Sequence, residues 1–235
     1  MTRSHSIFWE CTRPTCGFRY VEVPSEGADG PNALQGSVCP RCGAPARQAA
    51  VQPLPARESS AARVPPRPSP TLALLLDNFR SAYNVGAAFR TADAAGVAHI
   101  YLAGISPAPP HPAVAKTALG AEQTVPWSQH PNAPRLAARL KQAGWQLWAL
   151  ETHPQAVRLE TLLTRPLPPK LLLAFGNEVA GLDPSLIAQA DAVVALPMWG
   201  FKHSLNVAAA IAASLYVLRL SKPTRTDPRA TAMVK

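Results

Sequence analysis

The sequence predicts an α/β domain with a mostly parallel sheet, preceded by a small module that holds all four cysteines. Two observations support this prediction. From Thr71 onward, short apolar runs alternate with helix-like segments, a pattern typical of a parallel sheet covered by helices on both faces. Before Thr71, paired cysteines are followed by a stretch rich in proline, alanine, serine and arginine that lacks apolar periodicity. The expected parts are a cysteine module at 1–44, a proline-rich linker at 45–70, the α/β domain at 71–220 and a basic tail at 221–235.

The expected strands of the α/β domain are short runs of apolar residues. The run "TLALLL" at 71–76 is continuous, as in a strand that is buried on both faces. Further strands are expected at 98–104, 145–150, 170–176 and 191–197, with a weaker one at 124–127. Helices are expected at 84–95, 133–144, 183–190 and 204–220. The first of these helices stops before Gly96, a common residue at helix ends.

The charge of the chain is strongly basic and unevenly distributed. The formal net charge is +9, and the last fifteen residues hold four Lys or Arg against one Asp or Glu. Basic extensions around a milder body favour a polyanionic partner such as RNA or DNA. A basic surface that serves only solubility has the same charge balance, so this alternative stays open.

The sequence shows neither a secretory signal nor a membrane-spanning segment. The start, "MTRSHSIFWECT", has no apolar core of the required length. The longest apolar run, at 207–213, is much shorter than the ~20 residues that span a bilayer. We therefore expect a cytoplasmic protein without a membrane partner.

The four cysteines form the pattern C-x4-C…C-x2-C, which is typical of a zinc-ribbon-like module. They are Cys11, Cys16, Cys39 and Cys42. Two such pairs can place four thiolates around one tetrahedral Zn²⁺, and four Cys leave no open position for catalysis, so the zinc would be structural. Gly17 and Gly43 follow the two pairs, where such turns need conformational freedom. Loose cysteines and a redox pair are the alternatives; only one pair has the C-x-x-C spacing, without the βαβ context of redox proteins.

Three polar loops that contain glycine follow three of the expected strands. They read "DNFRSAYNVGAAFRTADAAG", "GNEVAGL" and "PMWGFKHSLN". In open α/β sheets, ligands bind beyond the carboxyl ends of the strands, so these loops are expected to meet at one ligand site. Taken singly, the residues also fit ordinary roles. Asn84 and Ser204 are good N-cap residues, Gly86 suits close packing, and Arg90 suits a solvated helix surface.

The order and spacing of these residues resemble a known family. The motifs are N-x5-N-x-G-x3-R (Asn78, Asn84, Gly86, Arg90), FGNE-x2-GL (Phe175 to Leu182) and LP-x6-SLNV-x-A (Leu196 to Ala209). They look like the three motifs of the SpoU/TrmH-type RNA ribose 2′-O-methyltransferases of the SPOUT superfamily. The resemblance covers about residues 71–220 and leaves out the cysteine module. It implies a C-terminal trefoil knot, an S-adenosyl-L-methionine pocket, a homodimer and an RNA substrate, either tRNA or rRNA.

The resemblance also implies roles for individual residues. The cofactor would contact Leu150, Gly176, Asn177, Glu178, Leu196, Met198 and Leu205. A glycine at 176 suits a backbone that must approach a ligand closely. The catalytic set would be Arg90, Asn84, Ser204, Asn206 and Glu178. Because deprotonating a guanidinium is very costly, our hypothesis is that Arg90 orients the 2′-oxygen and stabilises its developing negative charge. Ser204 and Asn206 would cap the last helix and also face the ribose.

Three other functions fit the sequence less well. The hypothesis of a dinucleotide-binding dehydrogenase has little support, because no G-x-G-x-x-G follows the first strand. A non-catalytic RNA-binding protein with a decayed methyltransferase body is disfavoured by the intact polar motifs. A base methyltransferase of the same superfamily is disfavoured by the "NVG…R" and "SLN" signatures.

Overall fold

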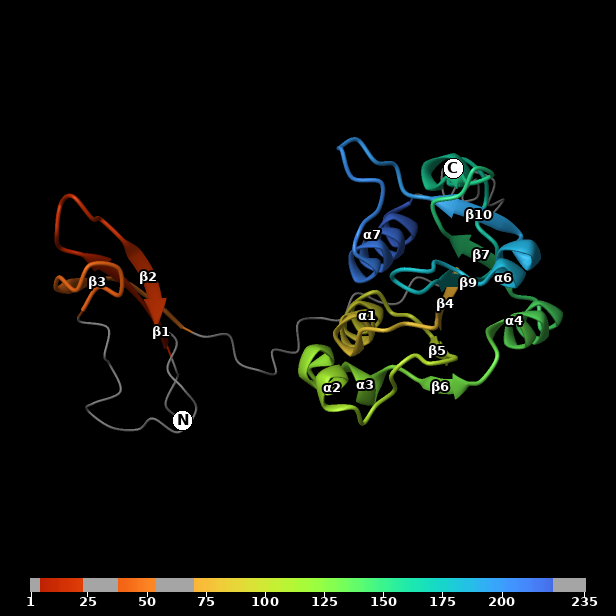
Figure 1. The fold of residues 1–235 in the computed structure, drawn as a ribbon, viewed down its shortest axis with the longest axis horizontal. Helices are drawn as coiled ribbons and strands as arrows, with labels where there is room; N and C mark the ends of the chain where they lie inside the picture. Colours follow the sequence, from red (N-terminus) through yellow and green to blue (C-terminus); the bar gives the residue numbers. More distant parts are fainter. Residues whose placement is uncertain (1–4, 23–37, 54–69, 222–235) are drawn as a thin grey trace, which may run out of the picture. The chain divides into compact units, whose positions relative to one another are not determined.

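The fold is described from a computed structural model, which defines residues 5–22, 38–53 and 70–221 (Figure 1). The chain divides into two units, Met1–Val64 and Pro65–Lys235, and each is described by itself. The predicted tail at 221–235 lies outside the described residues except for Ser221. None of the described helices is both long and apolar enough to cross a membrane.

The first unit contains a three-stranded antiparallel sheet with the order β2-β1-β3. The strands are β1 (His5–Cys11), β2 (Arg19–Glu22) and β3 (Ala46–Pro53). β3 lies inside the stretch predicted as linker, so that prediction is wrong for 46–53. The strand sequence "ARQAAVQP" lacks apolar alternation, and its pairing with β1, with Val51 opposite Ile7, could not be inferred from it. The rest of the predicted linker, 54–69, lies outside the described residues.

The second unit is built on a seven-stranded sheet with the order β6-β5-β4-β9-β7-β10-β8. All of its strand pairs are parallel, which confirms the predicted α/β class. The strands are β4 (Thr71–Asp77), β5 (His99–Ala103), β6 (Trp127–His130), β7 (Gln146–Leu150), β8 (Val157–Arg158), β9 (Lys170–Phe175) and β10 (Ala192–Ala195). The trefoil knot implied by the resemblance is not established by this strand order and stays a prediction.

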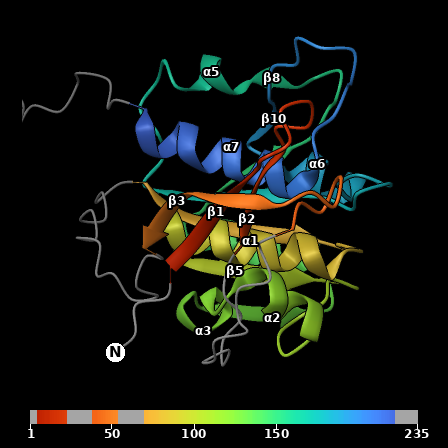
Figure 2. The same ribbon diagram turned by 90° about the vertical axis from the view of Figure 1, so that its left-hand side faces the viewer.

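Helices cover both faces of this sheet (Figures 1 and 2). They are α1 (Ala82–Ala94), α2 (Pro112–Ala118), α3 (Ala121–Thr124), α4 (Ala133–Gln142), α5 (Leu159–Leu162), α6 (Pro184–Gln189) and α7 (Val207–Leu220). Side chains alternate along β4, so that Leu74 packs in the cluster with α1 and α7, whereas Leu75 packs in the cluster with α4 and α6. Because both faces are buried, the central strands need to be apolar at every position.

Most predicted elements are present, and the differences have local causes. The weak strand predicted at 124–127 is wrong in position, because α3 runs to Thr124 and β6 begins at Trp127. The helix predicted from Ser204 begins at Val207, because Asn206 is its N-cap. The helix predicted from Asn84 begins at Ala82, and its N-cap is Ser81. The short elements α2, α5 and β8 were not predicted.

Candidate active site

A cavity of about 650 Å³ lies at the carboxyl edge of β7, β9 and β10. Its walls come from three segments, which follow β7, follow β9, and join β10 to α7. All seven residues predicted to contact a cofactor line it: Leu150, Gly176, Asn177, Glu178, Leu196, Met198 and Leu205. Residues up to 60 positions apart, from Leu150 to Ala210, therefore converge on one site, at the edge where parallel sheets bind ligands.

The loop after β9 is held in a tight turn by its own backbone. The amide of Asn177 donates to the carbonyl of Gly181 at 3.0 Å, and the amide of Gly181 donates back at 2.9 Å. A Cβ added to Gly176 would lie 2.2 Å from backbone atoms of Gly181 and Leu182. The glycine at 176 is therefore required by contact within the chain. Close approach of a ligand to this backbone, the reason given for the glycine above, stays a prediction.

Glu178 connects this loop to the start of α1. One carboxylate oxygen accepts a hydrogen bond from the backbone amide of Arg80 at 2.8 Å. The other accepts from the amide of Ser81 at 3.1 Å and from the Asn84 side chain at 2.8 Å. The carbonyl oxygen of the Asn84 side chain accepts in turn from Asn206 at 3.2 Å. Three distant parts of the sequence are thus joined through one line of polar side chains, although Asn84 does not itself line the cavity.

Glu178 is ionised at neutral pH in this arrangement. Burial acts to raise its pKa, but the hydrogen bonds from the Arg80 amide, the Asn84 side chain and the Ser81 amide outweigh burial, and the net pKa is lowered. The carboxylate also lies at the N-terminus of α1, where the exposed amides favour negative charge.

We expect Glu178→Gln to lower the free energy of unfolding near neutral pH, because it removes the charge from the acceptor of three hydrogen bonds. The loss is expected to be only about 1 kcal/mol, since Glu178 is solvent-exposed and its charged contacts are screened. A carboxylate whose pKa is lower in the folded state than in the unfolded state stabilises the fold at pH values above the unfolded-state pKa. This stabilisation is lost as the pH falls through the folded-state pKa. Urea unfolding at neutral pH and below the ordinary Glu value of 4.5 checks this prediction. A difference between the two proteins that has the same size at both pH values would contradict it.

Asn206 and Ser204 play different roles at the start of α7. The Asn206 side chain accepts from the amides of Ala208 at 2.9 Å and Ala209 at 3.4 Å, and so caps the helix. Ser204 lines the cavity, is exposed, and makes no hydrogen bond with another described residue. The prediction that Ser204 helps to cap the helix is therefore wrong. Its hydroxyl group is available to a ligand.

Arg90 is not brought to the cavity wall. It lies on α1 and is exposed, and it has no hydrogen-bond or ion-pair partner among the described residues. It is fixed relative to the cavity only through its own helix, whose first turn is tied to Glu178. Arg90 is therefore an exposed cation on α1 that is free to meet an anionic group.

The remaining motif residues have structural roles. Asn78 adopts a left-handed conformation with φ of 56°, which asparagine tolerates better than most residues. Its side chain bonds Asp77 at 2.8 Å and accepts from the amide of Ile105 at 3.2 Å. A Cβ added to Gly86 would lie 1.9 Å from Oγ1 of Thr117 on α2, so this glycine permits the close packing of α1 and α2.

Glu151 is a cavity residue that the sequence reading missed. Its carboxylate accepts from the amide of Leu182 at 3.0 Å and from the amide of Thr152 at 2.9 Å. Its position directly after β7, at the same sheet edge, was the available signal. With Glu178 it gives the cavity two carboxylates, and none of the described lining residues is Lys or Arg. The site therefore favours a ligand that carries positive charge.

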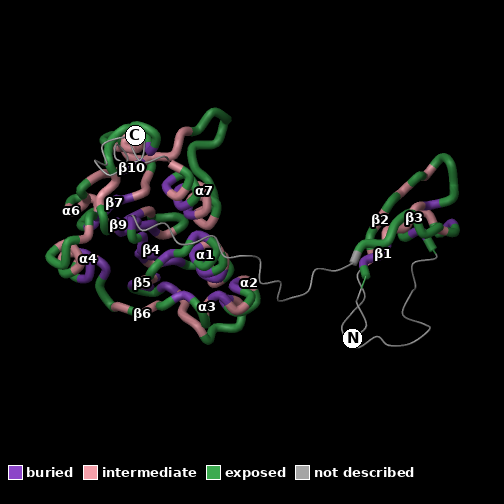
Figure 3. Tube along the Cα trace, turned by 180° about the vertical axis from the view of Figure 1, so that it is seen from behind, coloured by how far each residue is buried: buried purple, intermediate pink, exposed green. Residues whose placement is uncertain are grey.

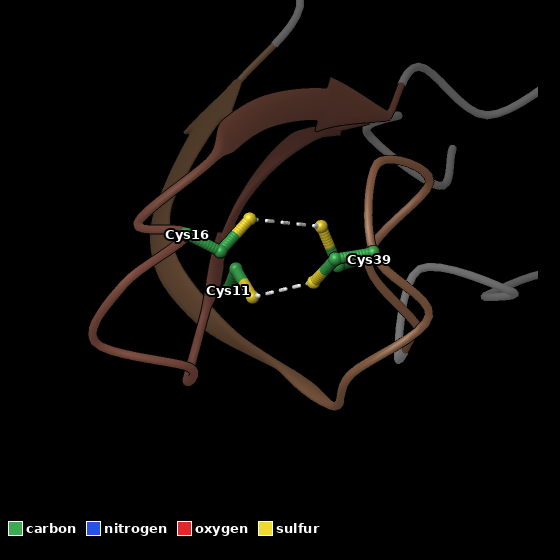
Figure 4. Close-up of side chains that lie close together, drawn as sticks. Cys11, Cys16 and Cys39 are labelled. Carbon is green, nitrogen blue, oxygen red and sulfur yellow. Dashed lines mark hydrogen bonds between the residues drawn. The ribbon is translucent and has the colours of Figure 1, made fainter.

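The four cysteines of the first unit meet at one point (Figure 4). Their sulfur atoms all lie within 4.8 Å of one another, with 3.5 Å between Cys11 and Cys42 and 4.0 Å between Cys16 and Cys39. A tetrahedral Zn²⁺ with bonds of about 2.3 Å needs sulfur atoms about 3.8 Å apart. The geometry of the four thiols therefore fits a zinc ion.

The backbone around the cysteines is shaped to bring their sulfur atoms together. Gly17 and Gly43 both have positive φ, at 52° and 68°, as expected for the turns after each pair. Burial raises the pKa of the Cys11 thiol to about 12, whereas the backbone amide of Ala44 lowers the pKa of Cys42 to about 7. A bound divalent cation deprotonates a coordinating thiol outright and so suits this mixed set.

Comparison with known proteins agrees with the site. The model of the SpoU rRNA Methylase family matches residues 71–216. A tRNA (guanosine(18)-2′-O)-methyltransferase from Borreliella burgdorferi is 29% identical, over 64% of this chain and 68% of that relative. The 23S rRNA (guanosine-2′-O-)-methyltransferase RlmB from Pseudomonas putida is 33% identical, over 63% of this chain and 58% of the relative, so the chain spans little more than half of that protein.

A solved structure gives the same result. The SpoU methyltransferase AviRb from Streptomyces viridochromogenes, in complex with the cofactor AdoMet, superposes with a TM-score of 0.58 and 27% identity. The match covers 72% of this chain and 66% of that one. The family match includes every segment that forms the cavity and most of the second unit. The chain belongs to the SpoU rRNA Methylase family.

Proposed function

We propose that the protein transfers a methyl group from S-adenosyl-L-methionine to the 2′-hydroxyl of a ribose in tRNA or rRNA. The observation that carries this proposal is the cavity, which joins all the predicted cofactor contacts to the polar line Glu178–Asn84–Asn206. The related proteins named above act as guanosine 2′-O-methyltransferases on tRNA and 23S rRNA, which supports both the reaction and the substrate class.

The cavity suits S-adenosyl-L-methionine in size, polarity and charge. Its volume of about 650 Å³ lies within the range of ~300–1,000 Å³ usual for small-molecule sites. Leu150, Leu196 and Leu205 offer apolar surface for an adenine ring, and Gly176 also lines the wall. Glu151 and Glu178 suit the positive charge of a sulfonium ligand. When bound, the cofactor supplies an electrophilic methyl group.

The polar residues beside the cavity are assigned to the ribose. We infer that Ser204 and Asn206 hold the nucleotide at the cavity mouth, while Asn84 and Glu178 fix the position of Asn206. Arg90 is assigned to the 2′-oxygen, whose negative charge grows as its proton leaves. Alignment of the two reacting atoms supplies much of the rate enhancement in such in-line transfers. A guanidinium near the developing charge adds electrostatic stabilisation.

The first unit is assigned a structural zinc ion, held by Cys11, Cys16, Cys39 and Cys42. Four thiolates leave no open coordination position, so the ion would hold the unit's fold and take no part in methyl transfer. We also propose that the protein is cytoplasmic and acts as a homodimer. Ala209, Tyr216 and Leu220 are exposed along one side of α7, which supports a second copy on that helix.

Two measurements test the proposed function. Calorimetry is expected to show binding of S-adenosyl-L-methionine, because the cofactor contacts are all present. Radiolabelled methyl transfer to RNA lacking the modification is expected to give a product that resists alkaline cleavage at one position, since a methylated 2′-oxygen cannot attack the neighbouring phosphate. Failure to bind the cofactor would favour the non-catalytic alternative. Label on a base would favour the base methyltransferase.

A further inference from the structure

The segment that joins β10 to α7 carries two aromatic side chains that are almost fully exposed. Trp199 is 88% exposed and Phe201 is 91% exposed, the highest values among the exposed large hydrophobic residues of the described chain. Figure 1 shows this blue segment projecting as an open loop beyond the two elements, and Figure 3 shows it in the colour of exposed residues. A pair of large aromatic rings left in water marks a binding surface.

The two rings lie at the rim of the cavity. Met198 comes directly before Trp199 and lines the cavity, and His203, two residues after Phe201, lines it as well. Neither ring stacks on another aromatic ring of the described residues. Gly200, between them, has open space around its Cα. With so much of their surface exposed, both side chains are accessible to a partner.

The charge around the rings points to an anionic partner. Lys202 follows Phe201 directly and is exposed, and the sequence contains no Asp or Glu between 192 and 226. Arg80 is also exposed, and its amide is bonded to Glu178 on the cavity wall. The two carboxylates of the site, those of Glu151 and Glu178, line the cavity and accept hydrogen bonds from backbone amides. The exposed cations suit the phosphate backbone of a nucleic acid. The carboxylates that line the cavity suit a cationic ligand.

We propose that Trp199 and Phe201 stack on unpaired bases beside the target nucleotide, so that this enzyme methylates ribose only where the RNA is single-stranded. The inference rests on the proposed function and specifies its substrate. Each stacked base contributes about 1–3 kcal/mol in single-strand binding proteins. In a duplex both faces of a base are covered by its neighbours, so projecting rings gain nothing there. A second copy of the chain on the same rings is the competing partner.

The test compares a fluorescent single-stranded RNA with the same strand annealed to its complement, by anisotropy on the full-length protein. Changing both Trp199 and Phe201 to Ala is expected to weaken single-strand binding at least about tenfold and to leave duplex binding unchanged. The matched controls are Trp199→Phe with Phe201→Tyr, which keeps stacking, and Leu at both positions, which keeps apolar area only. The first control is expected to bind like the wild type, and the second like the Ala variant.

Three readouts separate the possible failures. Cofactor binding by calorimetry and oligomeric state by light scattering are expected to match the wild type in every variant. If the wild type binds no cofactor, the proposed function fails and this inference fails with it. If cofactor binding is intact but the Ala variant binds single-stranded RNA normally, only the stacking proposal is overturned. Normal RNA binding by the Leu variant would show that apolar area is sufficient without stacking, and a loss of the dimer would assign the rings to a protein contact. Either result would overturn the proposal too.

Discussion

Arg90→Ala is expected to abolish methyl transfer while leaving the affinity for S-adenosyl-L-methionine nearly unchanged. The physical reason is the position of Arg90, which is exposed on α1 and does not line the cavity. Its loss therefore removes no contact from the cofactor. It does remove the cation assigned to the 2′-oxygen, and deleting one donor of this kind typically costs about 10²- to 10³-fold in rate. Single-turnover methyl transfer and calorimetry on the same preparation measure both quantities.

Two matched variants test whether the effect comes from the guanidinium. Arg90→Lys keeps the charge but loses the planar pair of donors, so we expect it to recover only part of the rate. Arg139→Ala removes an exposed arginine from α4, on the opposite face of the sheet, and is expected to leave the rate unchanged. Full activity of Arg90→Ala would refute the assignment. Loss of cofactor binding together with activity would show that Arg90 supports the fold of the site instead.

The parallel sheet could be predicted because its strands are buried on both faces. Leu72 to Leu76 are fully buried, and such a run has few other stable arrangements. The cavity could be predicted because the strand ends of a parallel sheet meet at one edge. The seven cofactor contacts were implied by the resemblance to the methyltransferase family, and all seven line the cavity. The sequence pattern alone was sufficient to predict those elements whose burial requires apolar residues.

The sequence pattern was not sufficient to predict the role of a residue whose type suits several roles. Ser204 and Asn206 are equally good caps by sequence, and only the backbone path shows that Asn206 takes that position. Gly176 suits a ligand or a neighbouring strand, and the structure shows contact with Gly181. Glu151 is an ordinary charged residue until its carboxylate is seen holding the amide of Leu182. Such roles depend on contacts between distant residues, which local sequence does not encode.

Removing the metal is expected to unfold the first unit and leave the second intact. The buried apolar residues of the described part of the first unit are only Ile7, Cys11, Cys39 and Ala44. A core of this size rarely holds a small domain together without a metal or disulfides. Structural zinc contributes about 10–16 kcal/mol in zinc-finger peptides, more than any other interaction available to this unit. We therefore expect the unit's fold to depend on a metal ion held by its four thiolates.

Hydrogen exchange measured by mass spectrometry resolves this effect by segment. After chelation, the amides of β1, β2 and β3 are expected to lose protection, whereas those of β4 and β9 keep theirs. Zn²⁺ is expected to restore protection and Mg²⁺ is not, because thiolates bind soft cations and Mg²⁺ prefers oxygen ligands. Cys39→Ser is expected to behave like the chelated protein. Protection of β1 that survives chelation would contradict the prediction, because the antiparallel sheet would then be stable on its own backbone pairing.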